Sequence, residues 1–224
     1  MAPITSVSDY FSQTARHQLP LFQRAYVWGE DQVKKLVGDV EEVSKDAARS
    51  RPYGLGHITD ADGDEPGCLD LVDGYQRTMT LMMILACLRD QSATAAEKER
   101  YDAMLWLPAG SGQEPRLLTQ SNVRDVFRDY VLRPGATEVE PPEAGPPLSI
   151  AEQRIVSNRN VIRDRLAEMT PFGRQSFART LTDTCFVVVV SFADAETAWE
   201  MVKKEQETGV DHHAVDTAKH TLVG

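Results

Sequence analysis

The stretch Leu71-Val72-Asp73-Gly74-Tyr75-Gln76-Arg77-Thr78 decides most of what can be inferred about the fold. Cys68 to Asp73 alternates in the manner of a strand, Gly74 breaks it, and residues 78–88 are almost entirely apolar. The pattern predicts a strand, a glycine turn and a helix that is buried on most sides. Such a junction directs free backbone N–H groups and the positive end of the helix dipole toward one point, where phosphate can bind.

Two charged side chains of this junction suit phosphate chemistry. Arg77 offers a bidentate contact to phosphate oxygens, and Asp73 offers a ligand for Mg²⁺ or an acceptor that orients a water. The alternative is an ordinary turn, in which Thr78 caps the helix and Arg77 is solvated. On spacing alone this alternative is favoured, because strand–glycine–helix junctions are common.

A second segment, Leu19 to Trp28, contains Phe22-Gln23-Arg24-Ala25-Tyr26-Val27-Trp28. It is predicted to be extended, because Pro20 disfavours helix at the preceding residue and aromatic residues favour strands. The Arg24 guanidinium stands among aromatic rings, an arrangement that proteins use to grip a nucleobase and its phosphates. The alternative is a segment that lines the core with Arg24 in a salt bridge, and by itself the segment favours this alternative.

The remaining patterns predict an α+β fold. Strands are expected at 53–58 and at 185–191, where four consecutive valines suit a sheet buried on both faces, and 60–67 is expected to be an acidic hairpin loop. Helical periodicity predicts helices at 30–48, 93–107, 117–132, 149–169, 173–182 and 194–205, with another starting in 211–222.

One internal boundary is plausible. Residues 133–148 hold five prolines and two glycines without apolar periodicity, which predicts a long exposed connection. We therefore expect a core with its first added helices in 1–132, a proline-rich connection in 133–148, and helices with a returning strand in 149–224 that complete the same domain.

Composition narrows the class of protein further. The 224 residues are 42% apolar and 26% charged, which is typical of a soluble globular chain, and no stretch is long and apolar enough to span a membrane. The formal charge of −10 excludes a general attraction to nucleic acid, so any phosphate contact must be local. Three widely spaced cysteines give neither a disulfide framework nor a metal motif and favour a reducing cytoplasm.

Taken together and in this order, the segments resemble the N-terminal domain of GmrS-type modification-dependent restriction proteins. That family's pattern is a Phe-Gln-Arg-x-Tyr-x-Trp segment, a Leu-Gly strand and an Asp-Gly-Gln-Gln-Arg loop, which are similar here to 22–28, Gly54-Leu55-Gly56 and 73–77. The late strand 185–190, Glu207-Thr208-Gly209 and Asp216-Thr217-Ala218-Lys219 extend the similarity. Within that family the chain resembles the members that sense phosphorothioate-modified DNA.

The resemblance implies a ParB/sulfiredoxin-like mixed sheet with packed helices, plus a helical region. It also implies binding and hydrolysis of a nucleoside triphosphate, GTP or another, with Mg²⁺. Implied partners are modified double-stranded DNA and an HNH-type nuclease, acting together in anti-phage defence, with no membrane. The nuclease half is absent from these residues, so we expect it on a longer protein or on a separate subunit.

The resemblance also implies residue roles. Catalytic roles fall to Asp73, Gln76 and Arg77, with Asp73 also holding the metal. The residues expected to bind the nucleotide are Gln23, Arg24, Trp28, Gly54, Gly56, His57, Gly74, Tyr75 and Thr78. Tyr75 departs from the pattern, because the family usually has glutamine there, and Gln206 and His212 replace the usual asparagine and leucine of the late signature.

Two alternatives stay open. The departure at Tyr75 favours a non-catalytic module that binds modified DNA or a nuclease partner with a degenerate pocket. A nuclease acting in its own right is disfavoured, because no second carboxylate or histidine is placed to complete a metal site with Asp73. Separately, Arg154 to Arg179 holds six arginines against three acidic residues counted from Glu152, which indicates either a DNA-docking face or an ordinary charged helix face.

Overall fold

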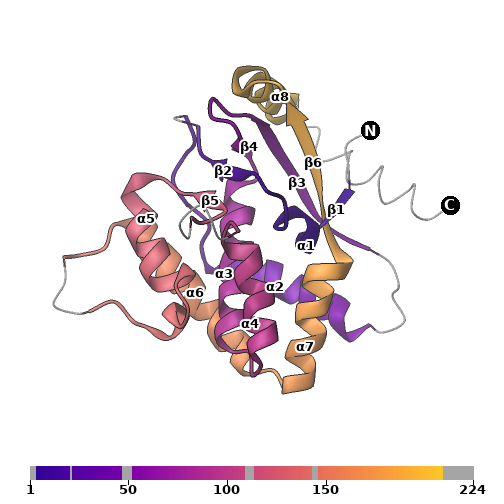
Figure 1. Ribbon diagram of the computed structural model, residues 1–224, viewed down its shortest axis with the longest axis vertical. Helices are drawn as coiled ribbons and strands as arrows, with labels where there is room; N and C mark the ends of the chain where they lie inside the picture. Colours follow the sequence, from indigo (N-terminus) through magenta and orange to yellow (C-terminus); the bar gives the residue numbers. More distant parts are fainter. Residues whose placement is uncertain (1–3, 21, 47–51, 109–113, 143–145, 209–224) are drawn as a thin grey trace.

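The computed structural model describes residues 4–20, 22–46, 52–108, 114–142 and 146–208 of the chain. They form a six-stranded mixed sheet with helices packed around it, which confirms the α+β class (Figure 1). The strands are β1 (Ile4–Ser6), β2 (Arg16–Gln18), β3 (Tyr53–Asp62), β4 (Cys68–Asp73), β5 (Leu117–Leu118) and β6 (Cys185–Phe192). The helix predicted at 211–222 and the late signature beyond Thr208 lie outside the described residues.

The strand order is β1-β6-β3-β4-β2-β5. Pairs β1–β6 and β3–β4 are antiparallel, whereas β3–β6, β2–β4 and β2–β5 are parallel. The valine-rich strand β6 lies inside the sheet between β1 and β3, and its residues Cys185 to Val189 are buried, as predicted. The sheet therefore joins segments from both ends of the described chain.

The α-helices cover most of the predicted helical segments. They are α1 (Val7–Tyr10), α2 (Glu30–Lys45), α3 (Tyr75–Asp90), α4 (Ala95–Leu105), α5 (Ser121–Phe127), α6 (Ile150–Ala167), α7 (Pro171–Arg179) and α8 (Ala195–Thr208). Short π-helical turns follow α5 at Arg128–Leu132 and α7 at Thr180–Thr184, and a 3₁₀ turn spans Ala136–Glu138. Among the described residues, no helix is long and apolar enough to span a membrane.

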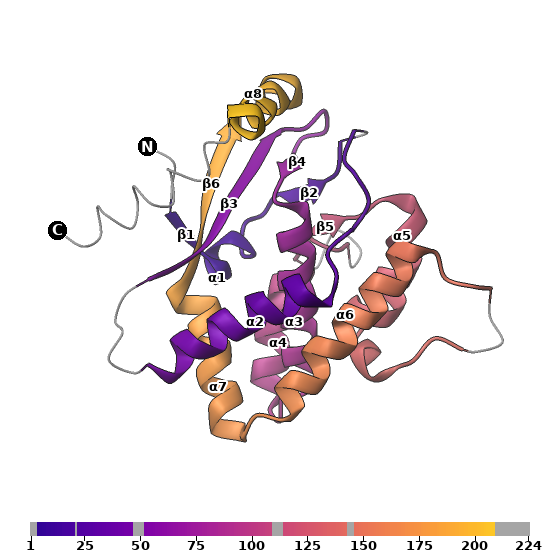
Figure 2. The ribbon, with the colours of Figure 1, turned by 180° about the vertical axis from the view of Figure 1, so that it is seen from behind.

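Helix α3 forms the centre of the core, as its apolar sequence predicts. All its residues except Arg77 and Asp90 are buried, and α2, α4 and α6 are packed into the same core cluster. Helix α8 is set apart from the other helices in both views (Figures 1 and 2) and packs with Ala61 and Val72 in a smaller cluster. Since neighbouring strand residues face opposite sides, Leu71 faces the α3 core and Val72 faces α8.

Three predictions from local patterns are wrong in part. The segment 19–28 contains no strand among its described residues; it is an irregular loop that leaves β2 and leads to α2. The predicted helix at 117–132 begins with strand β5, because Leu117 and Leu118 pair with β2 before the chain turns into α5. Strand β3 extends to Asp62, so Asp60 is a buried strand residue near His17 rather than a residue of an exposed loop.

The connection at 133–148 is not exposed throughout. Ala136 and Thr137 are buried, and the fully buried Arg159 of α6 donates hydrogen bonds to the carbonyls of Ala136, Thr137 and Val139. Asp90 at the end of α3 accepts hydrogen bonds from the backbone N–H and the hydroxyl of Thr137. The first part of this segment is therefore fastened to the helical body by buried charged groups.

Three of the six arginines between 154 and 179, all of them on α6, are paired within the fold. Arg159 is buried, Arg163 pairs with Glu140 and Asp164, and Arg165 makes a bidentate contact with Glu41 of α2. Acidic partners neutralise these guanidinium groups, and the resulting ion pairs fasten α6 to neighbouring segments. For these three arginines the structure supports the ordinary charged helix face over a DNA-docking surface.

Candidate functional site

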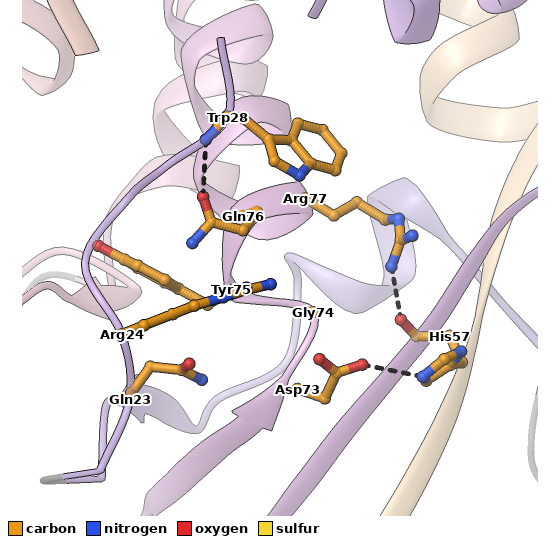
Figure 3. A pocket seen from close by; sticks show the side chains of 9 residues that line it. All are labelled: Gln23, Arg24, Trp28, His57, Asp73, Gly74, Tyr75, Gln76 and Arg77. Atoms are coloured by element: carbon orange, nitrogen blue, oxygen red, sulfur yellow. Dashed lines mark hydrogen bonds and ion pairs between the residues drawn. The ribbon is translucent and has the colours of Figure 1, made fainter. Parts of the chain in front are cut away.

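A pocket of about 150 Å³ opens where β4 ends and α3 begins (Figure 3). Polar and aromatic side chains from β3, the 19–29 loop and the β4–α3 junction surround it. Its lining residues are Gln23, Arg24, Trp28, His57, Asp73, Gly74, Tyr75, Gln76 and Arg77. Each of these was predicted from the sequence as a site residue, and the fold brings together three segments that are distant in the chain.

Gly74 makes the junction possible. Its backbone has φ of 92°, in the left-handed region that favours glycine, and a Cβ there would lie 3.0 Å from Cγ1 of Ile58. No side chain caps the helix that follows, and its first intrahelical bond runs from the Thr78 N–H to the Gly74 carbonyl. The first turn of α3 therefore carries backbone N–H groups without helical acceptors at the edge of the pocket.

Asp73 and His57 form an ion-pair contact across β4 and β3, with 2.9 Å between Oδ2 and Nε2. Burial tends to raise the pKa of Asp73, but the hydrogen bond and charge of His57, the Gly74 N–H and the Arg77 charge together hold that pKa below its usual value. Asp73 is therefore a carboxylate at neutral pH, half-buried and available as an acceptor or metal ligand.

Arg77 lies against the backbone of β3. Its Nη1 donates to the His57 carbonyl at 2.7 Å, and burial lowers its pKa while Asp73 opposes that shift. Gly56 has φ of 114°, and a Cβ there would come within 2.7 Å of the Arg77 guanidinium. Gly56 thus does not line the pocket as predicted, but its missing side chain is what lets Arg77 take this position.

Gln76 holds the loop rather than the pocket interior. Its Oε1 accepts from the N–H groups of Val27 and Trp28 at 2.8 and 3.2 Å, and its Nε2 donates to the Ala25 carbonyl at 3.0 Å. Both ends of the amide are engaged, so in this arrangement Gln76 anchors the loop to the start of α3. These contacts give Gln76 a positioning role, and its predicted catalytic role stays a prediction.

Asn158 of α6 fastens the same loop from the other side, and sequence reasoning missed it. Its Nδ2 donates to the Tyr26 hydroxyl at 3.0 Å and to the Trp28 carbonyl at 2.9 Å. Tyr26 is fully buried and also contacts the Thr80 hydroxyl at 2.8 Å. The available signal was a polar residue within the apolar stripe that contains Ile155 and Ile162.

Arg24 is the most available cation of the pocket. It is exposed, and among the described residues it has no hydrogen bond or ion pair. Figure 3 shows its guanidinium reaching inward from the loop, whereas that of Arg77 reaches in from the helix. Gln23 beside it donates through Nε2 to the carbonyls of Leu71 and Val72, which fixes the loop along β4.

Two other predicted residues lie outside the pocket. Thr78 is buried and follows Arg77 by one helical position, about 100° around the axis, so it faces the core instead. Gly54 pairs with Phe186 of β6, just before a register irregularity in β3. Tyr75 lines the pocket but is 2% exposed, and its hydroxyl has no hydrogen-bond partner among the described residues.

The depressed pKa of Asp73 has a measurable consequence for stability. Its carboxylate stabilises the fold fully above the ordinary aspartate pKa of 3.8, and this contribution is lost as pH falls through the lower folded-state value. We expect the free energy of unfolding of the wild type to fall more steeply below about pH 4 than that of Asp73→Asn. Urea unfolding at pH 7, 5, 4 and 3 measures the difference, and parallel curves would contradict it.

The fold and pocket define a class of α+β domain that presents arginine and carboxylate groups at a strand–glycine–helix junction. The family model described as GmrSD restriction endonuclease, N-terminal domain, matches residues 7–220. The chain therefore belongs to the GmrSD family and to its modification-dependent restriction systems, as the sequence resemblance predicted. No curated protein matches the sequence.

Proposed function

We propose that the pocket binds the polyphosphate of a nucleoside triphosphate together with Mg²⁺, and that hydrolysis is tied to the sensing of modified DNA. The observation that carries the proposal is the convergence of Arg24, Arg77 and the open first turn of α3 on one pocket that also holds Asp73. Two arginines and free N–H groups form a site for a multiply charged oxyanion.

The charge distribution supports a specific anion site. The chain carries a net charge of −10, so this cationic pocket differs in sign from the molecule as a whole. Arg24 has no acidic partner among the described residues. A partnerless arginine beside a helix N-terminus is therefore available to a phosphate ligand rather than committed to holding the fold.

The size of the pocket indicates which part of the ligand it holds. At about 150 Å³ it is smaller than the roughly 300–1,000 Å³ of sites that enclose a whole small molecule. The phosphates would therefore occupy the pocket, and the nucleoside would lie toward its mouth. Trp28 offers an aromatic surface there that suits any base, which leaves the choice of GTP or another nucleotide to experiment.

The residues present fit Mg²⁺ only when phosphate is bound. The described residues contain no group of three or more His, Cys, Asp or Glu side chains placed to hold a metal, so Asp73 would act with phosphate oxygens and water. This is the usual Mg²⁺ arrangement, which relies on one or two carboxylates and the substrate. When bound, the ion would neutralise phosphate charge as the phosphoryl group is transferred.

The chain's own residues would position and stabilise the reacting groups. Arg77, held by the His57 carbonyl, would contact phosphate oxygens as their charge redistributes. Asp73, kept ionised beside His57, would hold the metal or orient a water through its second oxygen. Gln76 would keep the loop that carries Arg24 in place. Phosphoryl transfer depends mainly on such positioning and electrostatic stabilisation.

A second candidate is a binding module without turnover, and two observations favour it. Tyr75 is buried with its pKa raised by burial, so its phenol cannot serve as a base at neutral pH. Gln76 has both amide atoms engaged with the loop. In this version the pocket senses nucleotide or modified DNA, and cleavage depends entirely on a nuclease carried elsewhere.

One pair of measurements separates the candidates. Calorimetry with GTP and ATP, each with Mg²⁺, tests binding, and phosphate release is followed with phosphorothioate-modified duplex, unmodified duplex of the same sequence, and no DNA. We expect binding and a turnover that rises with modified duplex. Binding without turnover supports the second candidate, whereas absence of nucleotide binding would overturn the proposal. If turnover rises with duplex that carries another modification but not with phosphorothioate, only the phosphorothioate specificity is refuted, and the proposed nucleotide site stands.

A further inference from the structure

We infer that the loop 22–28 mechanically couples the pocket to helix α8 on the other side of the sheet, through a stack of Phe22 on Trp199. The two rings lie 4.8 Å apart between centroids, with 28° between their planes. Lys203, one turn further along α8, places its Nζ 5.2 Å from the centre of the Trp199 ring. The loop therefore ends on α8 in a defined aromatic contact rather than in a diffuse apolar surface.

The loop touches both layers of the fold. Its Tyr26 end is buried in the α3 core, and its Phe22 end meets Trp199, which packs against the separate α8 cluster with Ala61 and Val72. Between the two ends, Gln23 binds the carbonyls of Leu71 and Val72, the two β4 residues that directly precede Asp73. A displacement of the loop would therefore shift both α8 and β4, the strand that carries the Asp73 carboxylate.

The two ends of the loop are held by different groups. Residues 25–28 are fixed by the Gln76 amide and by Asn158 through hydrogen bonds that are buried or part-buried. At the other end, Gln23 binds the carbonyls of Leu71 and Val72 and accepts a hydrogen bond from Gln120 at its own carbonyl, and Phe22 beyond it is 42% exposed. Arg24 lies between these two anchors, and the stack of Phe22 on Trp199 joins this anchored stretch of the loop to α8.

The identity of the ligand in this inference rests on the proposed function. The mechanical link between the loop 22–28 and α8 does not. If the docked loop places Arg24 for phosphate binding, ligand binding strengthens the contact with α8, and loss of the contact weakens ligand binding by the same factor. An aromatic pair of this kind corresponds to a change of roughly 2- to 10-fold in affinity. The stability of helix α8 would then depend on whether the pocket is occupied, and a nuclease that contacts α8 would respond to that change.

The ligand-free test uses hydrogen exchange of the full chain. Trp199→Ala is expected to speed amide exchange at residues 22–24 while leaving α3 unchanged. Met201→Ala removes an exposed side chain of the same helix and serves as the control, since Met201 is 48% exposed. Unchanged exchange at 22–24 in Trp199→Ala, or the same change in Met201→Ala, would overturn the coupling whether or not nucleotide binds.

The ligand test uses GTP with Mg²⁺ in calorimetry and in hydrogen exchange. Phe22→Ala and Trp199→Ala should each raise the Kd about 2- to 10-fold, and the double variant should be no weaker than either single one. Phe22→Tyr keeps the stack and should behave as wild type, as should Phe172→Ala, whose ring is 81% exposed on α7. Bound GTP should protect α8 in the wild type and not in Phe22→Ala.

The outcomes separate the two proposals. Additive effects of the two alanine variants, or GTP binding that leaves α8 exchange unchanged in the wild type, would overturn the coupling alone. Absence of GTP binding in every variant, with altered exchange at 22–24 in Trp199→Ala, would overturn the proposed nucleotide site and leave the mechanical link supported.

Discussion

Replacing Arg77 by alanine is expected to weaken binding of GTP with Mg²⁺ by about 100-fold, because charge-assisted contacts from a partly desolvated arginine are lost. The guanidinium is fixed beforehand by the His57 carbonyl and by the space that Gly56 leaves free, so the wild type loses little entropy on binding. Calorimetry measures the Kd, and thermal unfolding verifies that the variant is folded.

Two further variants sharpen this prediction. Arg77→Lys keeps the charge but not the planar pair of donors, so it should recover only part of the affinity. Arg179→Ala removes an exposed arginine of α7 and should leave the Kd unchanged. Nucleotide affinity that is equal in Arg77→Ala and the wild type would place the phosphates elsewhere.

Asp73→Asn is expected to lower phosphate release by roughly 10²- to 10⁴-fold, because it removes the pocket carboxylate that would hold the metal or orient a water. Binding of GTP without Mg²⁺ should be unchanged or tighter, since the substitution deletes a negative charge beside the phosphates. Asp73→Asn is therefore expected to slow phosphate release while nucleotide binding is retained, whereas Arg77→Ala is expected to weaken nucleotide binding itself. Single-turnover phosphate release together with calorimetry separates the two effects.

The matched control is Asp70→Asn. Asp70 lies on the same strand and accepts a hydrogen bond from Gln18 at 2.9 Å, away from the pocket. It should release phosphate at the wild-type rate. Equal turnover in Asp73→Asn and the wild type would remove Asp73 from the chemistry, and an equal drop in both variants would indicate a general loss of stability.

The patterns that could be predicted from sequence are local ones. The alternation of 68–73, the break at Gly74 and the apolar run after it correctly predicted β4 and α3, because each depends on neighbouring residues alone. The sequence also predicted every residue that lines the pocket. This prediction depended on the resemblance to a family whose motifs mark the loop and the junction, since each motif alone favoured an ordinary structural role, and the roles of these residues stay a prediction.

The errors concern contacts between distant segments. Leu117 and Leu118 pair with β2 in place of starting a helix, and Asp60 is buried because β3 continues beside β6. Arg159 was grouped with surface arginines, yet it is buried and binds backbone carbonyls of the 136–139 segment. Periodicity cannot reveal such partners, because they are set by which elements pack together.

The sequence by itself therefore determined most of the helices, the strands β3, β4 and β6, and the α+β class, and with the family resemblance it indicated the residues around one phosphate-suited junction. Only the tertiary structure decided their roles. It showed that Gln76 and Asn158 hold the loop, that Gly56 leaves space for Arg77, and that Phe22 stacks on α8. The physical reason is that a side chain's role depends on the groups that satisfy its polar atoms, and here those groups come from distant parts of the chain.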